Sequence, residues 1–220
     1  MKKRLFIVIP AYNEERTIGK VIEDLHKAGY HSVIVVDDGS KDKTALVAEQ
    51  TNVIVLKHAV NLGKGAAAKT GCDFALKQGA QILVLIDADG QHEAKDVPRF
   101  LKALKGKDVV FGYRDYGRAM PFVYRIGNRL INFATKKLYG IDLRDTQCGF
   151  RAMAAKAYQR IRWDANDYAM ETEMIANAGK HKLKYSEIPI KTIYSDKYKG
   201  TTIIDGARII FNIILWRLKK

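Results

Sequence analysis

Short apolar runs alternate with longer segments of helical periodicity along the first half of the chain. The runs predict strands at residues 4–9, 32–36, 53–56, 82–86 and 108–112. The segments between them predict helices near residues 14–29, 42–51, 64–78 and 96–105. Such alternation is typical of βαβ units, in which helices cover both faces of a mostly parallel sheet. The sequence therefore predicts an α/β fold with a Rossmann-like sheet.

Polar clusters follow the ends of four of these predicted strands, and the last three of them contain glycine. In a sheet of this kind, ligands bind outside the carboxyl ends of the strands. The clusters lie at residues 10–15, 37–40, 58–65 and 87–92. Each one taken alone is also explained by ordinary turn or helix-capping chemistry. Their concurrence at one edge of a sheet favours a binding site.

Two carboxylates in the fourth cluster indicate a metal ion. Asp87 and Asp89 stand one residue apart, directly after a predicted buried strand. Two such carboxylates are costly to hold together unless a cation lies between them. Mg²⁺ and Mn²⁺ prefer oxygen ligands and share their remaining positions with phosphates. The segment predicts a metal site for a phosphorylated substrate, with an Asp-Gly turn as the alternative.

The third cluster opens a predicted helix with two glycines on either side of a lysine. Gly63 and Gly65 would let the backbone at Lys64 come close to a ligand. Free N–H groups at a helix start bind anions, so a phosphate is one candidate ligand. A capped helix with an exposed lysine explains the same residues.

Charge and cysteine content narrow the class of protein. The 220-residue chain carries a net charge of +14, which points to polyanionic partners such as nucleic acid, anionic lipid or phosphorylated metabolites. Paired aspartates at strand ends would repel a nucleic-acid backbone, so a nucleic-acid-binding protein explains the charge but not the site. Cys72 and Cys148 are far apart and lack zinc-type spacing, which favours reduced thiols in a cytoplasmic protein.

Membrane-spanning and secretory segments are not expected. The first apolar run stops at Pro10 without a small-residue cleavage site, so it predicts a strand and not a signal peptide. No apolar stretch approaches the roughly 20 residues that a membrane-spanning helix needs. The chain is therefore not expected to cross a bilayer by itself.

Two amphipathic segments predict contact with a lipid surface. A helix at about residues 119–139 places Arg125 and Arg129 beside an apolar face, which suits an anionic head group with an apolar tail. From residue 203 to 220, apolar side chains cover most of a helix and basic residues close the chain, as in interfacial helices. The alternatives are a helix that covers the core for the first segment and a dimer or partner interface for the second.

Together, these motifs resemble the inverting glycosyltransferases of family two, which have the GT-A fold, and are similar to those of the dolichol-phosphate mannose synthases and their glucosyl counterparts. The matching segments lie at residues 10–15, 36–40, 61–65, 87–91 and 145–151. The resemblance covers essentially the whole chain. It implies a GT-A catalytic domain at residues 1–202, with helices flanking a mostly parallel sheet, and a C-terminal amphipathic membrane-interface helix at residues 203–220.

The resemblance also implies which residues bind the donor, the metal and the acceptor. The residues expected to bind a nucleotide sugar are Pro10, Tyr12, Glu14, Val36, Asp37, Asp38, Lys64, Asp87, Ala88, Asp89, Gln91, Arg114 and Lys199. The expected ligands of Mg²⁺ or Mn²⁺ are Asp87, Asp89 and Gln91. The acceptor phosphate is expected at Arg114, Arg125 and Arg129, and the expected catalytic residues are Asp89, Arg114 and Arg129.

The chemistry of the acceptor decides whether a general base is needed. A sugar hydroxyl must lose its proton, for which Glu173 or Asp145 are candidates. A polyprenyl phosphate is already an anion near neutral pH and needs only cationic positioning. In both cases a metal ion and an arginine aimed at the leaving diphosphate would stabilise the negative charge that builds up there.

We therefore predict a peripheral enzyme on the cytosolic face of a membrane. It would transfer mannose, with inversion, from GDP-mannose to dolichyl or polyprenyl phosphate, and glucose from UDP-glucose is the second choice. A separate transmembrane partner is compatible with this prediction, whereas nucleic acid is not an expected partner. A saccharide acceptor leaves the apolar last helix unexplained. A regulatory subunit without activity leaves Asp87, Asp89 and Arg114 unexplained.

Overall fold

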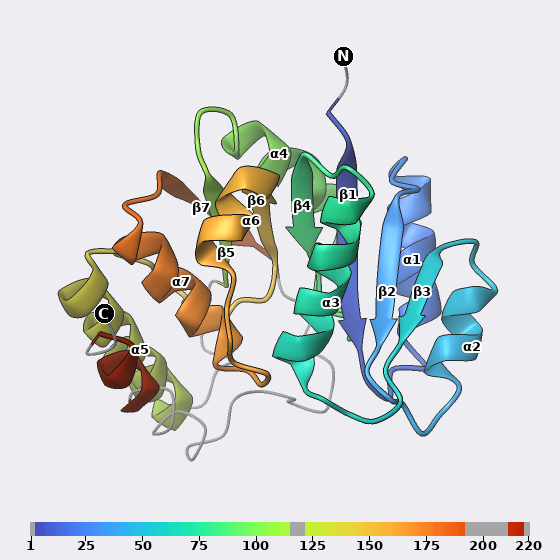
Figure 1. Ribbon diagram of the computed structural model, residues 1–220, viewed down its shortest axis with the longest axis horizontal. Helices are drawn as coiled ribbons and strands as arrows, with labels where there is room; N and C mark the ends of the chain where they lie inside the picture. Colours follow the sequence, from blue (N-terminus) through green and yellow to red (C-terminus); the bar gives the residue numbers. More distant parts are fainter. Residues whose placement is uncertain (1–2, 115–121, 192–210, 218–220) are drawn as a thin grey trace.

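A seven-stranded sheet lies at the centre of the computed structural model, which describes residues 3–114, 122–191 and 211–217 (Figure 1). The strands are β1 (Leu5–Ala11), β2 (Val33–Asp37), β3 (Ile54–Lys57), β4 (Ile82–Leu85), β5 (Val109–Arg114), β6 (Arg151–Ala154) and β7 (Tyr185–Ile190). Their order across the sheet is β3-β2-β1-β4-β6-β5-β7. All neighbouring strands are parallel except β6, which runs antiparallel to β4 and β5.

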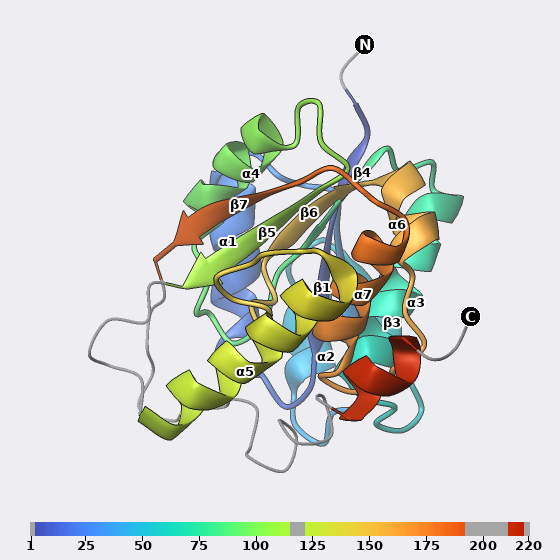
Figure 2. The ribbon, with the colours of Figure 1, turned by 90° about the vertical axis from the view of Figure 1, so that its left-hand side faces the viewer.

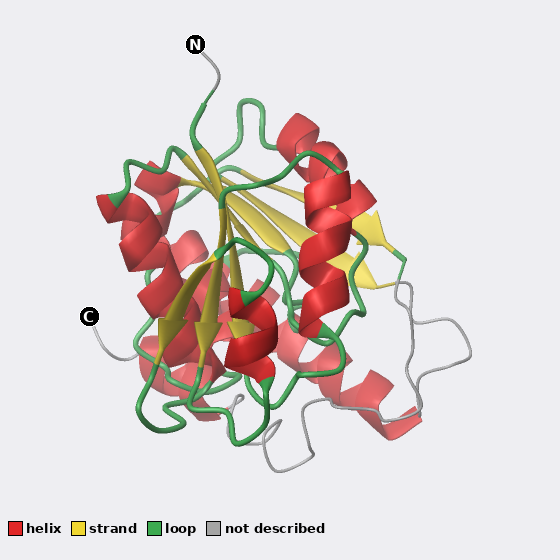
Figure 3. Ribbon diagram, turned by 90° about the vertical axis from the view of Figure 1, so that its right-hand side faces the viewer, coloured by secondary structure: helices red, strands yellow, loops and turns green. Residues whose placement is uncertain are grey.

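Helices cover both faces of the sheet (Figure 3). One face carries α1 (Ile18–Lys27), α2 (Thr44–Glu49) and α4 (Val97–Ala103), which follows a short 3-10 helix at Ala94–Asp96. The other face carries α3 (Lys64–Lys77), α6 (Ala155–Ile161) and α7 (Met170–Lys180). Alternate residues of β1 and β2 enter the two cores, because successive side chains of a strand point to opposite faces. Burial on both faces explains why these strands read as unbroken apolar runs.

A third apolar cluster joins α5 (Phe122–Tyr139) to α7 and to the helical residues 211–217 (Figure 2). Its buried members include Ile131, Ala176 and Ile213. The Tyr139 hydroxyl donates a hydrogen bond of 2.7 Å to the carbonyl oxygen of Ile213. The segment at residues 211–217 is therefore attached to the domain through one face of its helix.

The predicted α/β fold with a mostly parallel sheet is confirmed, and so are the five predicted strands and four predicted helices of the first half. The strands β6 and β7 and the helices α6 and α7 were not predicted. The strand β6 has only four residues and begins with a buried charged residue, Arg151. The sequence of β6 therefore does not read as an apolar run. Of the predicted helix at residues 119–139, the structure describes Phe122–Tyr139, and of that at residues 203–220 it describes residues 211–217.

Candidate active site

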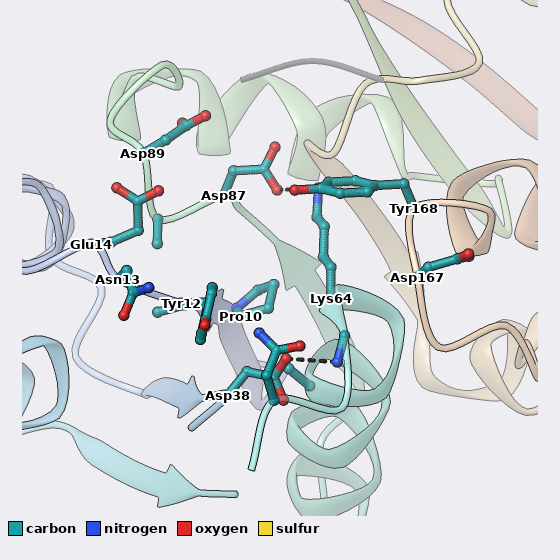
Figure 4. Close-up of a pocket in the computed structure, with 15 residues that line it drawn as sticks. Pro10, Tyr12, Asn13, Glu14, Asp38, Lys64, Asp87, Asp89, Asp167 and Tyr168 are labelled. Atoms are coloured by element: carbon teal, nitrogen blue, oxygen red, sulfur yellow. Dashed lines mark hydrogen bonds and ion pairs between the residues drawn. The ribbon is translucent and has the colours of Figure 1, made fainter. Parts of the chain in front are cut away.

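A cavity of about 450 Å³ opens where β1, β2 and β4 end (Figure 4). Its lining residues are Pro10, Ala11, Tyr12, Asn13, Glu14, Asp38, Asn61, Gly63, Lys64, Ala67, Asp87, Ala88, Asp89, Asp167 and Tyr168. Parallel pairing of β1 with β2 and with β4 places the three strand ends side by side. The predicted convergence of the strand exits at one edge of the sheet is therefore confirmed.

The carboxylate of Asp38 organises the loop that forms one wall of this cavity. It accepts hydrogen bonds from the backbone N–H groups of Leu62 at 3.0 Å and Gly63 at 2.7 Å. Its Oδ1 also lies 2.7 Å from Nδ1 of His58, whose Nε2 lies 3.0 Å from the Thr70 hydroxyl. Asp38 thus fixes the approach to α3 and does not cap α2.

The start of α3 is closed by the segment between α6 and α7. The Asn166 carbonyl accepts hydrogen bonds from the N–H groups of Gly65 at 2.7 Å and Ala66 at 3.2 Å. A Cβ atom at Gly65 would overlap the carbonyl oxygen of Ala165, so this close approach needs glycine. The interpretation that Gly63 and Gly65 offer free N–H groups to a phosphate is wrong, because protein oxygens already accept from both.

The side chain of Lys64 bridges two carboxylates from distant parts of the sequence, the half-buried Asp87 and the buried Glu171. Its Nζ lies 2.7 Å from Oδ1 of Asp87 and 2.8 Å from Oε1 of Glu171. It also lies 5.6 Å from the centre of the Tyr168 ring. Burial alone would lower the pKa of Lys64, but the charges of Asp87 and Glu171 outweigh burial and hold this pKa above its ordinary value. The ammonium therefore stays charged inside the cavity.

Asp87 and Asp89 have different electrostatic surroundings. Burial would raise the pKa of Asp87, but Lys64 and His92 outweigh burial and hold this pKa well below its ordinary value. The Nε2 atom of His92 lies 3.2 Å from Oδ2 of Asp87. Burial and the neighbouring charge of Asp87 raise the pKa of Asp89, whose Oδ1 accepts a hydrogen bond from the Gln91 N–H. The second carboxylate thus carries an electrostatic penalty that a cation would relieve.

These residues fit a divalent cation that is shared with a substrate. Within the part of the chain that the structure describes, no group of three or more His, Cys, Asp and Glu side chains is placed to hold a metal. Two carboxylates, Asp87 and Asp89, nevertheless match the usual Mg²⁺ arrangement, in which one or two carboxylates bind and substrate phosphates and water complete the shell. Gln91 does not line the cavity, and its role as a ligand stays a prediction.

Gly149 leaves the space that the Asp87 carboxylate occupies, and Gly149→Ala is expected to disturb the site. A Cβ atom at this position would overlap both carboxylate oxygens of Asp87. We expect Mn²⁺ and nucleoside diphosphate to bind at least tenfold more weakly, on the scale of about 1.4 kcal/mol per factor of ten. Isothermal titration calorimetry measures this change. The matched control is Gly127→Ala, where a Cβ atom meets nothing within 4 Å; equal affinity in the two variants would contradict the prediction.

Both candidate general bases, Asp145 and Glu173, are already engaged in hydrogen bonds. Asp145 is buried and accepts hydrogen bonds from Arg114 at 2.7 Å through Nε and at 3.2 Å through Nη2. The carboxylate of Glu173 accepts from the N–H groups of Asp164 at 3.1 Å and Ala165 at 2.8 Å. Glu173 therefore holds the segment that closes the start of α3. The structure does not place either carboxylate to take a proton from a sugar hydroxyl.

The predicted site residues lie in several places in the structure. Eight of them line the cavity: Pro10, Tyr12, Glu14, Asp38, Lys64, Asp87, Ala88 and Asp89. Val36 and Asp37 are buried in β2 and do not line it. Arg114, at the end of β5, also lies outside the lining, and Arg129 is exposed on α5. Lys199 and the side chain of Arg125 lie outside the described residues.

Sequence reasoning missed the contribution of the segment before α7 and the pairing of Glu171 on α7 with Lys64. Asp167 and Tyr168 line the cavity, and Glu171 pairs with Lys64. The acids of Glu171 and Glu173 also fit an exposed helix start, but both side chains are buried. The available signal was the occurrence of two acids at residues 169–176, a stretch whose other members are apolar except for Thr172.

Residues 6–162 match the model of the family described as Glycosyl transferase family 2. The chain belongs to this family. An uncharacterized protein of Methanocaldococcus jannaschii is 40% identical over 227 residues, which cover 99% of this chain and 93% of the relative. A UDP-N-acetylglucosamine–dolichyl-phosphate N-acetylglucosaminyltransferase of Methanococcus voltae is 34% identical, over 99% and 98% of the two chains. A polyprenol monophosphomannose synthase of Mycolicibacterium smegmatis is 27% identical, over 99% and 88%.

A solved structure shares the fold of this family 2 chain. Glucosyl-3-phosphoglycerate synthase of Mycobacterium tuberculosis, crystallised with Mn²⁺, UDP and phosphoglyceric acid, superposes with a TM-score of 0.75 at 20% identity. The match covers 98% of this chain and 78% of the synthase. The prediction of a GT-A fold is confirmed by this similarity together with the sheet topology.

Proposed function

We propose that this family 2 glycosyltransferase transfers a sugar, with inversion, from a nucleoside diphosphate sugar to a polyprenyl phosphate at the cytosolic face of a membrane. The observation that carries the proposal is the convergence of Asp87, Asp89 and Lys64 in one cavity at the ends of β1, β2 and β4. Two carboxylates and a half-buried ammonium are suitable groups to hold a metal-bound diphosphate. The lipid-phosphate acceptors named for two relatives support the acceptor class.

The cavity suggests a role for each lining group. Pro10, Tyr12, Glu14 and Asp38 line the part formed by β1 and β2, where we place the nucleoside. Asp87 and Asp89 would hold Mg²⁺ or Mn²⁺, which would supply a Lewis acid for the leaving diphosphate. Lys64 would add a second positive charge to the same diphosphate. These charges matter most as the bond between sugar and oxygen breaks, because negative charge then builds up on the leaving group.

The engagement of both candidate general bases in other contacts favours an acceptor that needs no base. Asp145 and Glu173 are occupied by Arg114 and by backbone N–H groups. A phosphate monoester already carries negative charge and attacks without losing a proton. We assign acceptor positioning to Arg114, Arg125 and Arg129, of which Arg129 is exposed on α5. A sugar-hydroxyl acceptor is disfavoured by the same observation.

Exposed apolar side chains on α5 and on residues 211–217 support a lipid surface as the site of action. Leu130 and Phe133 on α5 are exposed, as are Phe211, Ile214 and Leu215. The core-facing side of α5 uses other residues, such as Ile131 and Tyr139, so Leu130 and Phe133 do not cover the core. Among the described helices, none combines the length and apolar character needed to cross a bilayer. We propose peripheral attachment through these two helices.

The identity of the donor sugar and nucleotide is tested with a panel of nucleotide sugars. The sequence favours GDP-mannose with UDP-glucose second, and the 34% identical relative adds UDP-N-acetylglucosamine. We expect one of the three donors to give lipid product at least tenfold faster than the others, in the presence of Mg²⁺ or Mn²⁺ and a short polyprenyl phosphate. Thin-layer chromatography of radiolabelled lipid measures the product. If no donor is transferred or hydrolysed with any metal, the proposed function is wrong.

UDP-N-acetylglucosamine is the donor that we would test first. The relative that uses it is more similar to this chain than the mannose synthase, at 34% against 27% identity, and both matches cover 99% of this chain. GDP-mannose is the second candidate. The two donors differ in base and sugar, so competition by UDP or by GDP alone distinguishes the nucleoside from the sugar contribution.

A further inference from the structure

The predicted metal ligand Asp87 is already paired with a positively charged side chain. Lys64 pairs with Asp87 at 2.7 Å and with Glu171 at 2.8 Å. The three side chains are 20%, 22% and 3% exposed, so the pairing takes place largely away from water. Figure 4 shows Lys64 extending along the cavity to the Asp87 carboxylate. A divalent cation at Asp87 would meet a positive charge already in place.

Glu171 is the second carboxylate that pairs with the Lys64 ammonium. Its carboxylate is buried, and its Oε2 has no hydrogen-bond partner. Lys64 pairs with its Oε1, whereas the nearby Arg151 donates a hydrogen bond to the backbone carbonyl oxygen of Glu171. The charges of Arg151 and Glu171 also interact, but the ion pair of the Glu171 carboxylate is with Lys64. A buried carboxylate in such a pair holds its cation strongly, because breaking the pair leaves its charge poorly compensated.

We propose that Lys64 is an internal counter-ion that must release Asp87 before a divalent cation can bind, and that Glu171 is a positioning residue that keeps the released ammonium at the cavity. The proposal rests on the function proposed above and adds an order of events, in which Lys64 leaves Asp87 before the cation binds there. In the free protein, Lys64 competes with the cation for Asp87. When a diphosphate enters, Lys64 can pair with it and with Glu171 together, so the cation gains Asp87.

The anatomy of Lys64 suits such an exchange. Its backbone is the first residue of α3, and that start is held in place by the Asn166 carbonyl. Its flexible four-carbon side chain ends in a compact charge with three donors. The ammonium can therefore change partners without movement of the helix, provided that Glu171 remains as one of them.

Mn²⁺ binding to the free protein, without nucleotide, tests the counter-ion. Electron paramagnetic resonance of Mn²⁺ measures the affinity directly and does not depend on turnover. Lys64→Met and Lys64→Gln are expected to bind Mn²⁺ about tenfold more tightly than the unaltered chain, because the competitor for Asp87 is gone. Lys64→Arg keeps the charge and should not gain affinity. Lys77→Met, at the exposed end of the same helix, is the control for loss of a positive charge.

The effect of Glu171→Gln in two backgrounds tests the positioning role. In the chain with Lys64, Glu171→Gln should weaken Mn²⁺ binding about tenfold, because the ammonium then has Asp87 as its main partner. In the Lys64→Met background the loss should be less than about threefold, since only the direct effect of the Glu171 charge remains. An equal loss in both backgrounds overturns the positioning role. Circular dichroism checks that each variant is folded.

Two outcomes separate this inference from the proposed function. If the unaltered protein transfers a sugar but both neutral Lys64 variants bind Mn²⁺ as it does, the counter-ion inference is wrong and the proposed function stands. If the unaltered protein binds neither Mn²⁺ nor any nucleoside diphosphate, both are wrong. Tighter Mn²⁺ binding by the two neutral variants, with nucleoside diphosphate binding at least tenfold weaker, supports the exchange.

Discussion

Asp89→Asn is expected to lower sugar transfer by about 10²- to 10³-fold without loss of thermal stability. The factor is that of removing one group which stabilises transition-state charge. Stability should be unchanged or higher, because the carboxylate is already penalised. Burial and the charge of Asp87 raise the pKa of Asp89, so an uncharged amide of the same shape removes a repulsion. Trading stability for activity in this way is common at functional sites.

Two measurements separate this charge effect from misfolding. The transfer rate is followed at saturating Mg²⁺ or Mn²⁺, and the melting temperature is measured without metal. The matched control is Asp24→Asn, which removes a carboxylate from the surface of α1, where it pairs with Lys20. The control should keep both activity and stability. Full activity of Asp89→Asn would show that the assignment of Asp89 to the metal site is wrong. A large drop in the melting temperature of this variant would contradict the electrostatic account.

The first half of the fold could be predicted because its local pattern and its tertiary structure agree. The runs that became β1, β2 and β4 are buried on both faces, and their polar exits carry the site. Asp38, Asp87 and Asp89 were found at these exits and Lys64 at the exit of β3, and all four line one cavity. A parallel βαβ sheet brings consecutive strand ends together, so position in the sequence was enough to predict their convergence.

The second half of the site depends on contacts that no local pattern contains. Glu171 meets Lys64 because α7 packs on the same face of the sheet as α3. Asn166 closes the start of α3 through its backbone carbonyl, which any residue type carries. The start of β6 was hidden because Arg151 is buried and donates to the carbonyl oxygens of Thr146, Cys148 and Glu171. Charged residues are almost never fully buried unless they are paired, so sequence reasoning places them at the surface.

The exposed apolar residues of α5 and of residues 211–217 are expected to control attachment to membranes. Phe133→Ser combined with Ile214→Ser should weaken binding to anionic phospholipid vesicles by about a hundredfold. Fully burying a large apolar side chain stabilises binding by about 1.5–3 kcal/mol, or roughly tenfold or more for each residue. Phe133 is 67% exposed and Ile214 49% exposed, so neither substitution removes a core contact. Vesicle co-sedimentation at several lipid concentrations measures the change.

Point substitutions test the membrane surface more sharply than removal of residues 203–220. Ile213 is fully buried against α5 and α7, so a deletion would also open the third apolar cluster. The matched control is Leu46→Ser, because Leu46 is 51% exposed on α2, across the sheet from α5 (Figure 1). If attachment comes from the +14 charge alone, the double variant and the control will bind alike and high salt will release both. If the apolar surface inserts into lipid, the double variant alone loses binding, and transfer to a water-soluble short-chain acceptor continues at the unaltered rate.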